Sequence, residues 1–161
     1  MTLQRMNINT PLGVMMIAAS EQGLAGLWFD DQQHMPDYAC WDVVHSHPVL
    51  DQAKHEIDMY FKGQCTTFST PRAAAWGTEF QRQVWEMLMT IPLGCTLTYG
   101  DIAKKLHNPA AVRAVGAAVG RNPWSIMTPC HRVIGADGGL TGYAGGLERK
   151  IELLRLEGVL L

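Results

Sequence analysis

The sequence has few of the features that mark membrane, secreted or metal-binding proteins. No stretch reaches the roughly 18 apolar residues of a transmembrane helix, and the N-terminus has no charged and then apolar export pattern, so we predict a cytoplasmic protein without membrane contact. The four cysteines form no CxxC pair, which argues against a disulfide framework or a zinc knuckle. With 161 residues, 47% of them hydrophobic, the chain can bury a core as one domain or as two small ones.

A strong excess of charge is also absent, because the net charge at pH 7 is only −2. Taken alone, this value argues against a nucleic-acid partner. The two parts of the chain differ, however: up to Arg72 there are four basic and eight acidic residues, and beyond it nine basic and seven acidic residues. The second part is therefore weakly basic, which is a small indication of nucleic-acid contact there.

The first part of the chain predicts a small antiparallel sheet with one covering helix. Short apolar segments at 3–8, 13–19 and 23–29 are separated by turn residues, as in a meander. Residues 48–62 have apolar side chains at helical spacing, and a glycine follows them as a C-cap would. The mixed, polar stretch 30–47 between them is expected to be a surface loop.

A connector rich in small residues at 70–77 suggests two domains. We place the boundary after Arg72, which gives an N-terminal domain of residues 1–72 and a second domain of residues 73–161. His45 and His47 in the first domain have no third ligand at suitable spacing, so a surface position is expected for both.

The second domain predicts helices with clear start signals. Thr78 and Gln81 form a capping box for a helix that extends to about Met89, and Trp85 on this helix is expected to pack against the other domain. An amphipathic helix is predicted at the end of the chain, at 147–156, followed by a glycine stop.

Two further short helices predict a helix-turn-helix. Thr98 caps a helix that runs to Leu106, and Asn108 as N-cap with Pro109 as first helical residue begins another that runs to about Val119. The predicted fold class is therefore α/β (α+β), with a sheet-plus-helix domain followed by a mostly helical, winged-helix-like domain.

The second of these helices is nearly devoid of charge. Arg113 is its only charged side chain before Arg121, and its small residues are Ala110, Ala111, Ala114, Gly116, Ala117, Ala118 and Gly120. One arginine cannot provide a base-reading code in the major groove. The helix either packs in the interior through its small residues or approaches a surface closely, and if that surface is DNA, affinity comes from phosphates and shape.

A glycine-rich loop at 135–146 follows, without the lysine of a phosphate loop. So little side-chain bulk suits one wall of a pocket that admits a flat group. A plain surface linker explains the same composition, so both interpretations stay open.

The stretch at 128–133, Thr-Pro-Cys-His-Arg-Val, brings a thiol, an imidazole and a guanidinium together. Only the thiolate is nucleophilic, and a neighbouring imidazole or cation commonly lowers the pKa of a thiol. These residues predict a reactive cysteine site at Cys130 with His131 beside it. Cys130 as a small buried hydrophobe and His131 as a satisfied core residue form the alternative.

Five motifs of the second domain together resemble the O6-alkylguanine-DNA alkyltransferases, also called methylated-DNA–protein-cysteine methyltransferases. They are Arg-Ala-Val-Gly at 113–116, Asn-Pro at 122–123, Pro-Cys-His-Arg-Val at 129–133, Thr-Gly-Tyr-Ala-Gly-Gly at 141–146 and Leu-Glu-Gly at 156–158. Their order and spacing both agree with the family over residues 78–158. The first domain resembles it only in size and in its sheet-plus-helix pattern.

The resemblance implies DNA repair by direct, irreversible transfer of an alkyl group from guanine O6 to Cys130, without cofactor or turnover. It leaves O4-alkylthymine open as a second lesion. It also implies that His131 acts as the base on Cys130 through a water, that Glu157 orients the imidazole, and that Asn122 holds the turn between the helix-turn-helix and the site. The protein is then expected to act as a monomer on double-stranded DNA.

Contacts with DNA and base are carried over in the same way, with binding through the minor groove. The resemblance implies that Arg113 replaces the flipped base in the stack and that Tyr99 promotes rotation of the neighbouring phosphate. The remaining DNA-binding residues are Ala110, Ala114, Gly116 and Ala117. The guanine would be bound by Pro129, Val133, Tyr143, Ala144 and Tyr99. Its edge would be read by the Tyr99 hydroxyl, the Ala144 amide and the carbonyls of Cys130 and Val133.

Some positions depart from the commoner family pattern. Ala144 is a serine in some relatives, so a hydrogen bond here must come from the backbone N–H. Trp124 is bulkier and Thr128 more polar than expected, which leaves the preferred alkyl size open. Some relatives bind zinc in the N-terminal half, but Cys40 and Cys65 lack ligand spacing and we predict no metal. A Cys-His hydrolase and a damage-binding module without chemistry are the competing interpretations.

Overall fold

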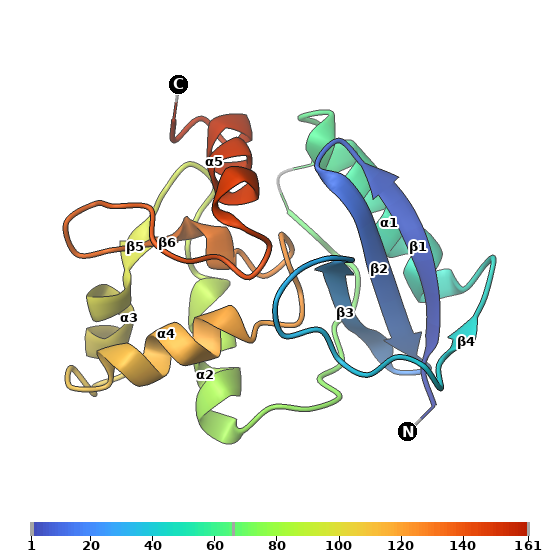
Figure 1. Cartoon of the computed structure of the whole chain (residues 1–161), viewed down its shortest axis with the longest axis horizontal. Helices are drawn as coiled ribbons and strands as arrows, with labels where there is room; N and C mark the ends of the chain where they lie inside the picture. Colours follow the sequence, from blue (N-terminus) through green and yellow to red (C-terminus); the bar gives the residue numbers. More distant parts are fainter. Residues whose placement is uncertain (1, 66, 161) are drawn as a thin grey trace. The chain divides into compact units, whose positions relative to one another are not determined.

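The computed structural model describes residues 2–65 and 67–160, which divide into two compact units between Trp76 and Gly77 (Figure 1). The sequence placed the boundary after Arg72. The first unit includes the connector up to Trp76, because the connector pairs with the sheet: Ala73 N donates to Leu24 O at 2.9 Å. No helix in the described ranges is long and apolar enough to cross a bilayer.

The first unit contains a four-stranded sheet in the order β3-β2-β1-β4. Strands β1 (Gln4–Thr10), β2 (Gly13–Ser20) and β3 (Gly23–Phe29) form the predicted antiparallel meander. The expectation of a plain loop at 30–47 was wrong in one respect, because β4 (Asp42–Val43) pairs in parallel with β1. A two-residue strand has no periodicity of its own, and its pairing depends on distant residues.

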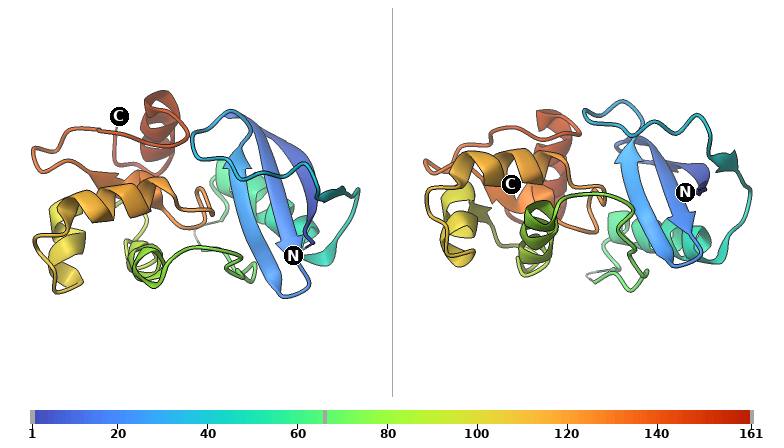
Figure 2. Two further views of the ribbon diagram at one scale, coloured as in Figure 1. Left: turned by 60° about the horizontal axis from the view of Figure 1, so that its bottom comes forward. Right: turned by 90° about the horizontal axis from the view of Figure 1, so that it is seen from below.

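Helix α1 (Pro48–Phe61) packs against one face of this sheet (Figures 1 and 2). Its start is fixed by His47, whose Nδ1 accepts a hydrogen bond from Val49 N at 3.1 Å. Its buried side chains include Leu50 and Ile57. His47 is therefore a helix cap, which explains this histidine without a metal.

Glu56 of α1 holds the segment at Ser69 and Thr70, which leads toward the end of the first unit. Its carboxylate accepts hydrogen bonds from the backbone and hydroxyl groups of both Ser69 and Thr70, at 2.5–3.1 Å. Burial alone would raise the pKa of Glu56, but these hydrogen bonds together hold it below its ordinary value. This carboxylate has a structural role in the first unit.

The other face of the sheet is covered by tryptophans. Trp28 on β3 packs against Trp41 and Trp76, with ring centroids 6.0 and 5.9 Å away. Because Trp76 belongs to this cluster, the core of the first unit extends to the residue at which the unit ends.

The second unit consists of helices around two very short strands. In chain order its elements are α2 (Glu79–Leu88), β5 (Leu97–Thr98), α3 (Tyr99–Lys105), α4 (Val112–Gly120), the 3₁₀ turn η1 (Cys130–Arg132), β6 (Val133–Ile134) and α5 (Leu147–Leu156). The capping boxes predicted at the starts of α2 and α3 are both present. Helices α3 and α4 lie side by side as a helix-turn-helix (Figures 1 and 2).

The start of α4 differs from the prediction. The helix begins at Val112, with Ala111 as an N-cap that makes no side-chain cap hydrogen bond. Asn108 instead accepts a hydrogen bond through its carbonyl from Ala111 N at 3.0 Å, which closes a tight turn. His107, with φ 59°, ends the preceding helix in a left-handed conformation, so the turn uses the residues that sequence signals assigned to a helix.

Trp85 was expected to contact the other domain, but its described partners lie within its own unit. Its indole Nε1 donates to Ala118 O of α4 at 2.8 Å, and its ring meets Trp124 edge-on at 5.8 Å. Gly77, with φ +104°, lies against the same ring, and a Cβ there would be 2.6 Å from the indole. Trp85 thus joins α2 and α4 in the core of the second unit.

Candidate active site around Cys130

The site is assembled by a two-stranded parallel ladder in the second unit. Leu97 of β5 pairs with Val133 of β6. Cys130 lies in the 3₁₀ turn that leads directly into β6, and Tyr99 is the first residue of the helix that follows β5. Because each strand has only two residues, the side chains of Cys130 and Tyr99 both lie near the ladder and therefore near each other.

Cys130 is a buried thiol, with 6% of its surface exposed. Burial raises the pKa of the Cys130 thiol above its ordinary value, and a hydrogen bond from the Asn122 side chain and the positive charge of Lys150 oppose this rise. The sequence attributed activation to the neighbouring imidazole and guanidinium. For the guanidinium this attribution was wrong, because Arg132 binds Glu157 and the Ile91 carbonyl, and the positive charge that favours the thiolate is that of Lys150.

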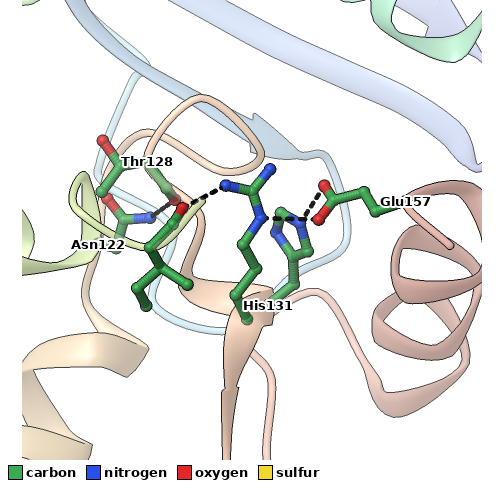
Figure 3. A network of polar contacts seen from close by, with 6 residues as sticks. Asn122, Thr128, His131 and Glu157 are labelled. Carbon is green, nitrogen blue, oxygen red and sulfur yellow. Dashed lines mark hydrogen bonds and ion pairs between the residues drawn. The ribbon is translucent and has the colours of Figure 1, made fainter. Parts of the chain in front are cut away.

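His131, Arg132 and Glu157 form a buried network (Figure 3). His131 Nε2 lies 2.6 Å from Glu157 Oε2, and Arg132 Nε donates to Glu157 Oε1 at 2.7 Å. Arg132 also donates through Nη1 to the Ile91 carbonyl at 2.7 Å. Glu157 follows the last residue of α5, so the end of this helix delivers the carboxylate to the turn that contains the thiol.

The tautomer of His131 follows from these contacts. Burial lowers the pKa of His131, although Glu157 opposes the shift, so the ring is neutral at pH 7. With its Nε2 proton directed at the Glu157 carboxylate, Nδ1 carries the lone pair. Nδ1 is buried and has no hydrogen-bond partner among the described residues. A neutral imidazole oriented by a carboxylate is the arrangement of a general base.

The side chain of Asn122 closes the loop between α4 and the thiol by hydrogen bonds to the backbone of this loop. Its Nδ2 donates to Thr128 O at 2.9 Å (Figure 3). Nδ2 also donates to Trp124 O at 3.2 Å, and Oδ1 accepts from Trp124 N at 3.0 Å. Within this loop Ile126 has φ 72°, a left-handed conformation that is rare for a β-branched residue. Thr128 directs its hydroxyl at Met89 Sδ, 3.4 Å away, and is fully buried.

Tyr99 is placed beside the nucleophile and the glycine-rich loop. Burial raises the pKa of the Tyr99 phenol, against a hydrogen bond with the Thr141 side chain, and the charge of Cys130 adds to the rise. On α4, Gly116 faces the ring of Tyr99, and a Cβ there would be 3.9 Å from it. The structure therefore brings Tyr99, Thr141 and Cys130 together.

The other predicted base-binding residues lie around this group. Pro129 and Val133 are buried on either side of η1, whereas Tyr143 and Ala144 are half-buried in the loop that leads to α5. The Val133 carbonyl already accepts a hydrogen bond from Lys150 Nζ at 2.5 Å. Since a carbonyl oxygen has two lone pairs, one is left for a ligand.

The predicted DNA-binding residues lie on the open side of the helix-turn-helix. Arg113, Ala114 and Ala117 are exposed on α4, as is Val112, whereas Val115 and Val119 are buried. Ala110 is also exposed, but it lies in the turn before α4 rather than on the helix. The helix is thus not packed into the interior through these small residues, which was the alternative left open by the sequence.

Sequence reasoning missed Lys150. This lysine is completely buried, and burial lowers its pKa to about 8, opposed by the nearby Cys130. The signal was present in the sequence, because Lys150 lies three and four residues before Leu153 and Leu154, on the apolar stripe of α5. Burying a lysine on the apolar stripe of a helix costs free energy, so such a position indicates a specific role for the side chain.

Two family models match the chain. The model described as 6-O-methylguanine DNA methyltransferase, DNA binding domain, matches residues 79–159. The model described as 6-O-methylguanine DNA methyltransferase, ribonuclease-like domain, matches residues 5–73. The second match extends the similarity to the first unit, where the sequence motifs carried little information.

Individual proteins agree with these matches. Methylated-DNA–protein-cysteine methyltransferase of Mycobacterium leprae is 43% identical over 94% of this chain and 90% of its own length, and that of Methanosarcina mazei is 44% identical over 93% and 94%. The crystal structure of Mycobacterium tuberculosis OGT in complex with DNA matches with a TM-score of 0.87 at 39% identity, covering 98% of this chain and 92% of that one.

Proposed function

Because the chain belongs to the 6-O-methylguanine DNA methyltransferase family, we propose that it repairs alkylated double-stranded DNA by moving the alkyl group from guanine O6 to Cys130. One observation carries the proposal. The buried thiol of Cys130 is followed in the chain by a buried histidine that Glu157 orients, in the unit that also contains the helix-turn-helix. Each part has a distinct task in such a transfer.

The transfer step requires a thiolate at the moment of attack. His131 accepts the thiol proton at Nδ1 through a water molecule, and Glu157 stabilises the resulting imidazolium through Nε2. The thiolate then attacks the saturated carbon of the adduct in line with the bond to O6. The S–C bond forms while the C–O bond breaks, and the electron pair of the C–O bond remains on the guanine. The guanine takes up one proton, which balances the proton that the thiol gave to His131.

The reaction ends with the alkylated protein. A thioether has no leaving group, so neither water nor His131 can regenerate the thiol at a useful rate. Each chain accordingly removes one alkyl group. No cofactor takes part, because acceptor and base are both side chains of the chain itself.

DNA is held by the helix-turn-helix, through the minor groove. The exposed small residues Ala114 and Ala117 let the backbone of α4 approach the duplex closely, and Arg113 at the start of this helix reaches into the stack. A single arginine suits a protein that reads shape rather than sequence, which the repair of lesions in any context requires. Gly116 keeps the ring of Tyr99 close to α4, and the phenol then promotes rotation of the neighbouring phosphate.

The lesion is bound as an extruded base, since a duplex base is inaccessible to a buried thiol. Pro129, Tyr143 and Tyr99 form the walls of its pocket. The free lone pair of the Val133 carbonyl and the Ala144 N–H read the guanine edge. O4-alkylthymine presents a similar alkyl–oxygen bond in a smaller ring, and we propose it as a second, slower substrate.

Stoichiometry tests the proposal. The protein is incubated with an excess of duplex containing O6-methylguanine, and restored guanine is counted per chain. We expect one per chain, at a chain mass that sedimentation assigns to a monomer. Repeated turnover on an ester would support a Cys-His hydrolase instead. Tight binding of the lesion without restored guanine would support a damage-binding module, and either result would overturn the transferase.

A further inference from the structure

Lys150 is a buried cation without an assigned task in this reaction. Its side chain, on α5, is completely buried. Nζ donates to Val133 O at 2.5 Å, to Thr141 O at 2.9 Å and to Gly142 O at 3.3 Å. An ammonium group has three protons, and these carbonyls use all of them. The lysine thus connects the strand after Cys130 with the start of the glycine-rich loop.

The three carbonyls are neutral, so they do not supply a counter-charge. Burial of an ammonium costs several kcal/mol unless an opposite charge is near. The group that favours the charged form of Lys150 is Cys130, and Lys150 in turn favours the thiolate of Cys130. The charges therefore stabilise each other once the thiol has lost its proton.

Other titratable groups near Cys130 do not take this role. His131 is neutral and directed at Glu157, and Arg132 is paired with the same carboxylate. Tyr99, from α3, is a phenol whose pKa is raised by burial, so it carries no charge at pH 7. The positive charge of Lys150 also lowers the pKa of His131, which keeps the base neutral and able to accept a proton.

We propose that Lys150 is a positioning residue for alkyl transfer, which ties the guanine-binding loop to the strand after Cys130 and serves as the buried counter-charge of the Cys130 thiolate. The proposal rests on the proposed function, because transfer to Cys130 is the reaction that the lysine supports. It has two separable parts, since the charge acts on the thiol whereas the three hydrogen bonds act on the loop.

Two substitutions separate these parts. Lys150→Met keeps much of the length of the side chain but removes charge and donors. Lys150→Arg keeps the charge and changes the geometry of the donors. Arg155→Met is the matched control, because Arg155 is a cation on the same helix that pairs with Glu152 at the surface.

The probe for the charge is iodoacetamide, with modification of the peptide that contains Cys130 followed by mass spectrometry from pH 6 to pH 10. This small electrophile needs neither DNA nor the guanine pocket. We expect the pH midpoint in Lys150→Met to rise by about one unit or more, as for loss of an opposite charge at close range, and to stay near the wild-type value in Lys150→Arg and Arg155→Met. The reaction of Lys150→Met at pH 7 should then be roughly tenfold slower.

The probe for the loop is free O6-benzylguanine, which must occupy the pocket. We expect Lys150→Arg to react more slowly than wild type with benzylguanine while its iodoacetamide midpoint is unchanged. An unchanged pH midpoint of iodoacetamide modification in folded Lys150→Met would overturn the role of the charge. If Lys150→Met does not fold, a raised midpoint in Lys150→Arg would overturn it instead. Because iodoacetamide reports on the thiol without DNA, these outcomes are independent of whether the protein removes methyl groups from DNA.

Discussion

The two units of the molecule differ in how they treat polar groups. Among the described residues, buried polar or charged side chains in the first unit are Gln32 and Thr70, and in the second unit they are Asn122, Ser125, Thr128, His131, Arg132, Lys150 and Glu157. Buried charge is expensive and is retained mainly where chemistry requires it. All the buried charges of the described residues lie in the second unit, which is the unit in which we propose that the reaction takes place.

Two glutamates make the comparison concrete. Glu56 of the first unit accepts hydrogen bonds from Ser69 and Thr70, which are neutral donors near the surface. Glu157 of the second unit binds His131 and Arg132 in the interior. Both carboxylates make polar contacts through both of their oxygens. Only Glu157 is coupled to a group that can move a proton, so similar contacts serve the fold in one unit and the reaction in the other.

The largest effect is expected from the nucleophile itself. Cys130→Ser should abolish alkyl transfer, because a hydroxyl is far less nucleophilic than a thiolate at neutral pH. Binding to duplex DNA should persist, since Cys130 is buried and the exposed residues of α4 are unchanged. Cys95→Ser, at an exposed cysteine of the same unit, is the control and should react as wild type. Methyl transfer by the Cys130→Ser protein would remove Cys130 from its role.

The base and its carboxylate come next. His131→Ala should slow the reaction by roughly 10²–10⁴-fold, the usual contribution of a general base. Glu157→Gln should slow it less, because the carboxylate acts only through His131. Rate constants for single-turnover transfer from duplex O6-methylguanine measure both, and wild-type rates in both variants would contradict the relay.

Glu157 also bears on stability, which the sequence did not suggest. Since Glu157 neutralises the buried Arg132, Glu157→Gln should lower the free energy of unfolding by about 3–5 kcal/mol. Glu152→Gln, at an exposed pair on the same helix, should cost about 1 kcal/mol or less. Equal unfolding midpoints in urea for the two variants would show that the buried pair contributes little.

The variant Arg113→Ala tests whether the alkylated guanine leaves the base stack of the duplex. Arg113→Ala should slow reaction with duplex DNA on the order of a hundredfold, because a few kcal/mol that offset unstacking are lost. Reaction with free O6-benzylguanine should hardly change, since nothing has to be flipped. The measured quantity is the ratio of the two second-order rate constants. If the ratio equals that of wild type, the docking of α4 on DNA is wrong.

The smallest effect is expected in the first unit. Glu56→Gln should leave transfer unchanged and lower stability at pH 7, because the hydrogen bonds that Glu56 accepts depress its pKa. A carboxylate whose pKa is depressed by folding stabilises the fold at pH values above its ordinary pKa of 4.5. This contribution is lost as the pH falls through the depressed pKa. The difference from wild type in unfolding free energy should therefore shrink toward pH 3. A slower transfer reaction at pH 7 would show that the two units are coupled.

What the sequence could predict follows from how local each signal is. Capping boxes and apolar stripes involve residues within one turn, so the starts of α2 and α3 and most of the meander were predicted. The pairing of β4 with β1 joins residues far apart in the chain, and the sequence of β4 contains no local signal that predicts this pairing. Asn108 had the right chemistry for a helix cap but was used in a turn, because the left-handed residue before it had already changed the direction of the chain.

The motif around Cys130 indicated a reactive thiol, and the resemblance supplied the roles of His131, Glu157 and Asn122, for which the structure shows matching contacts between His131 and Glu157 and within the Asn122 turn. The sequence misassigned the charge near the thiol. Adjacency in the chain pointed to Arg132, whereas packing of α5 against η1 brings Lys150 to the site. Such a contact depends on tertiary structure.

The most direct test of the account follows the alkyl group itself. The protein is mixed with excess duplex that contains O6-(trideuteromethyl)guanine, and its peptides are analysed by mass spectrometry. We predict one deuterated methyl group per chain, located on the peptide that contains Cys130, with an unmodified guanine left in the DNA. Label on the peptides of Cys40, Cys65 or Cys95, or a repaired duplex with no label on the protein, would contradict direct transfer to Cys130.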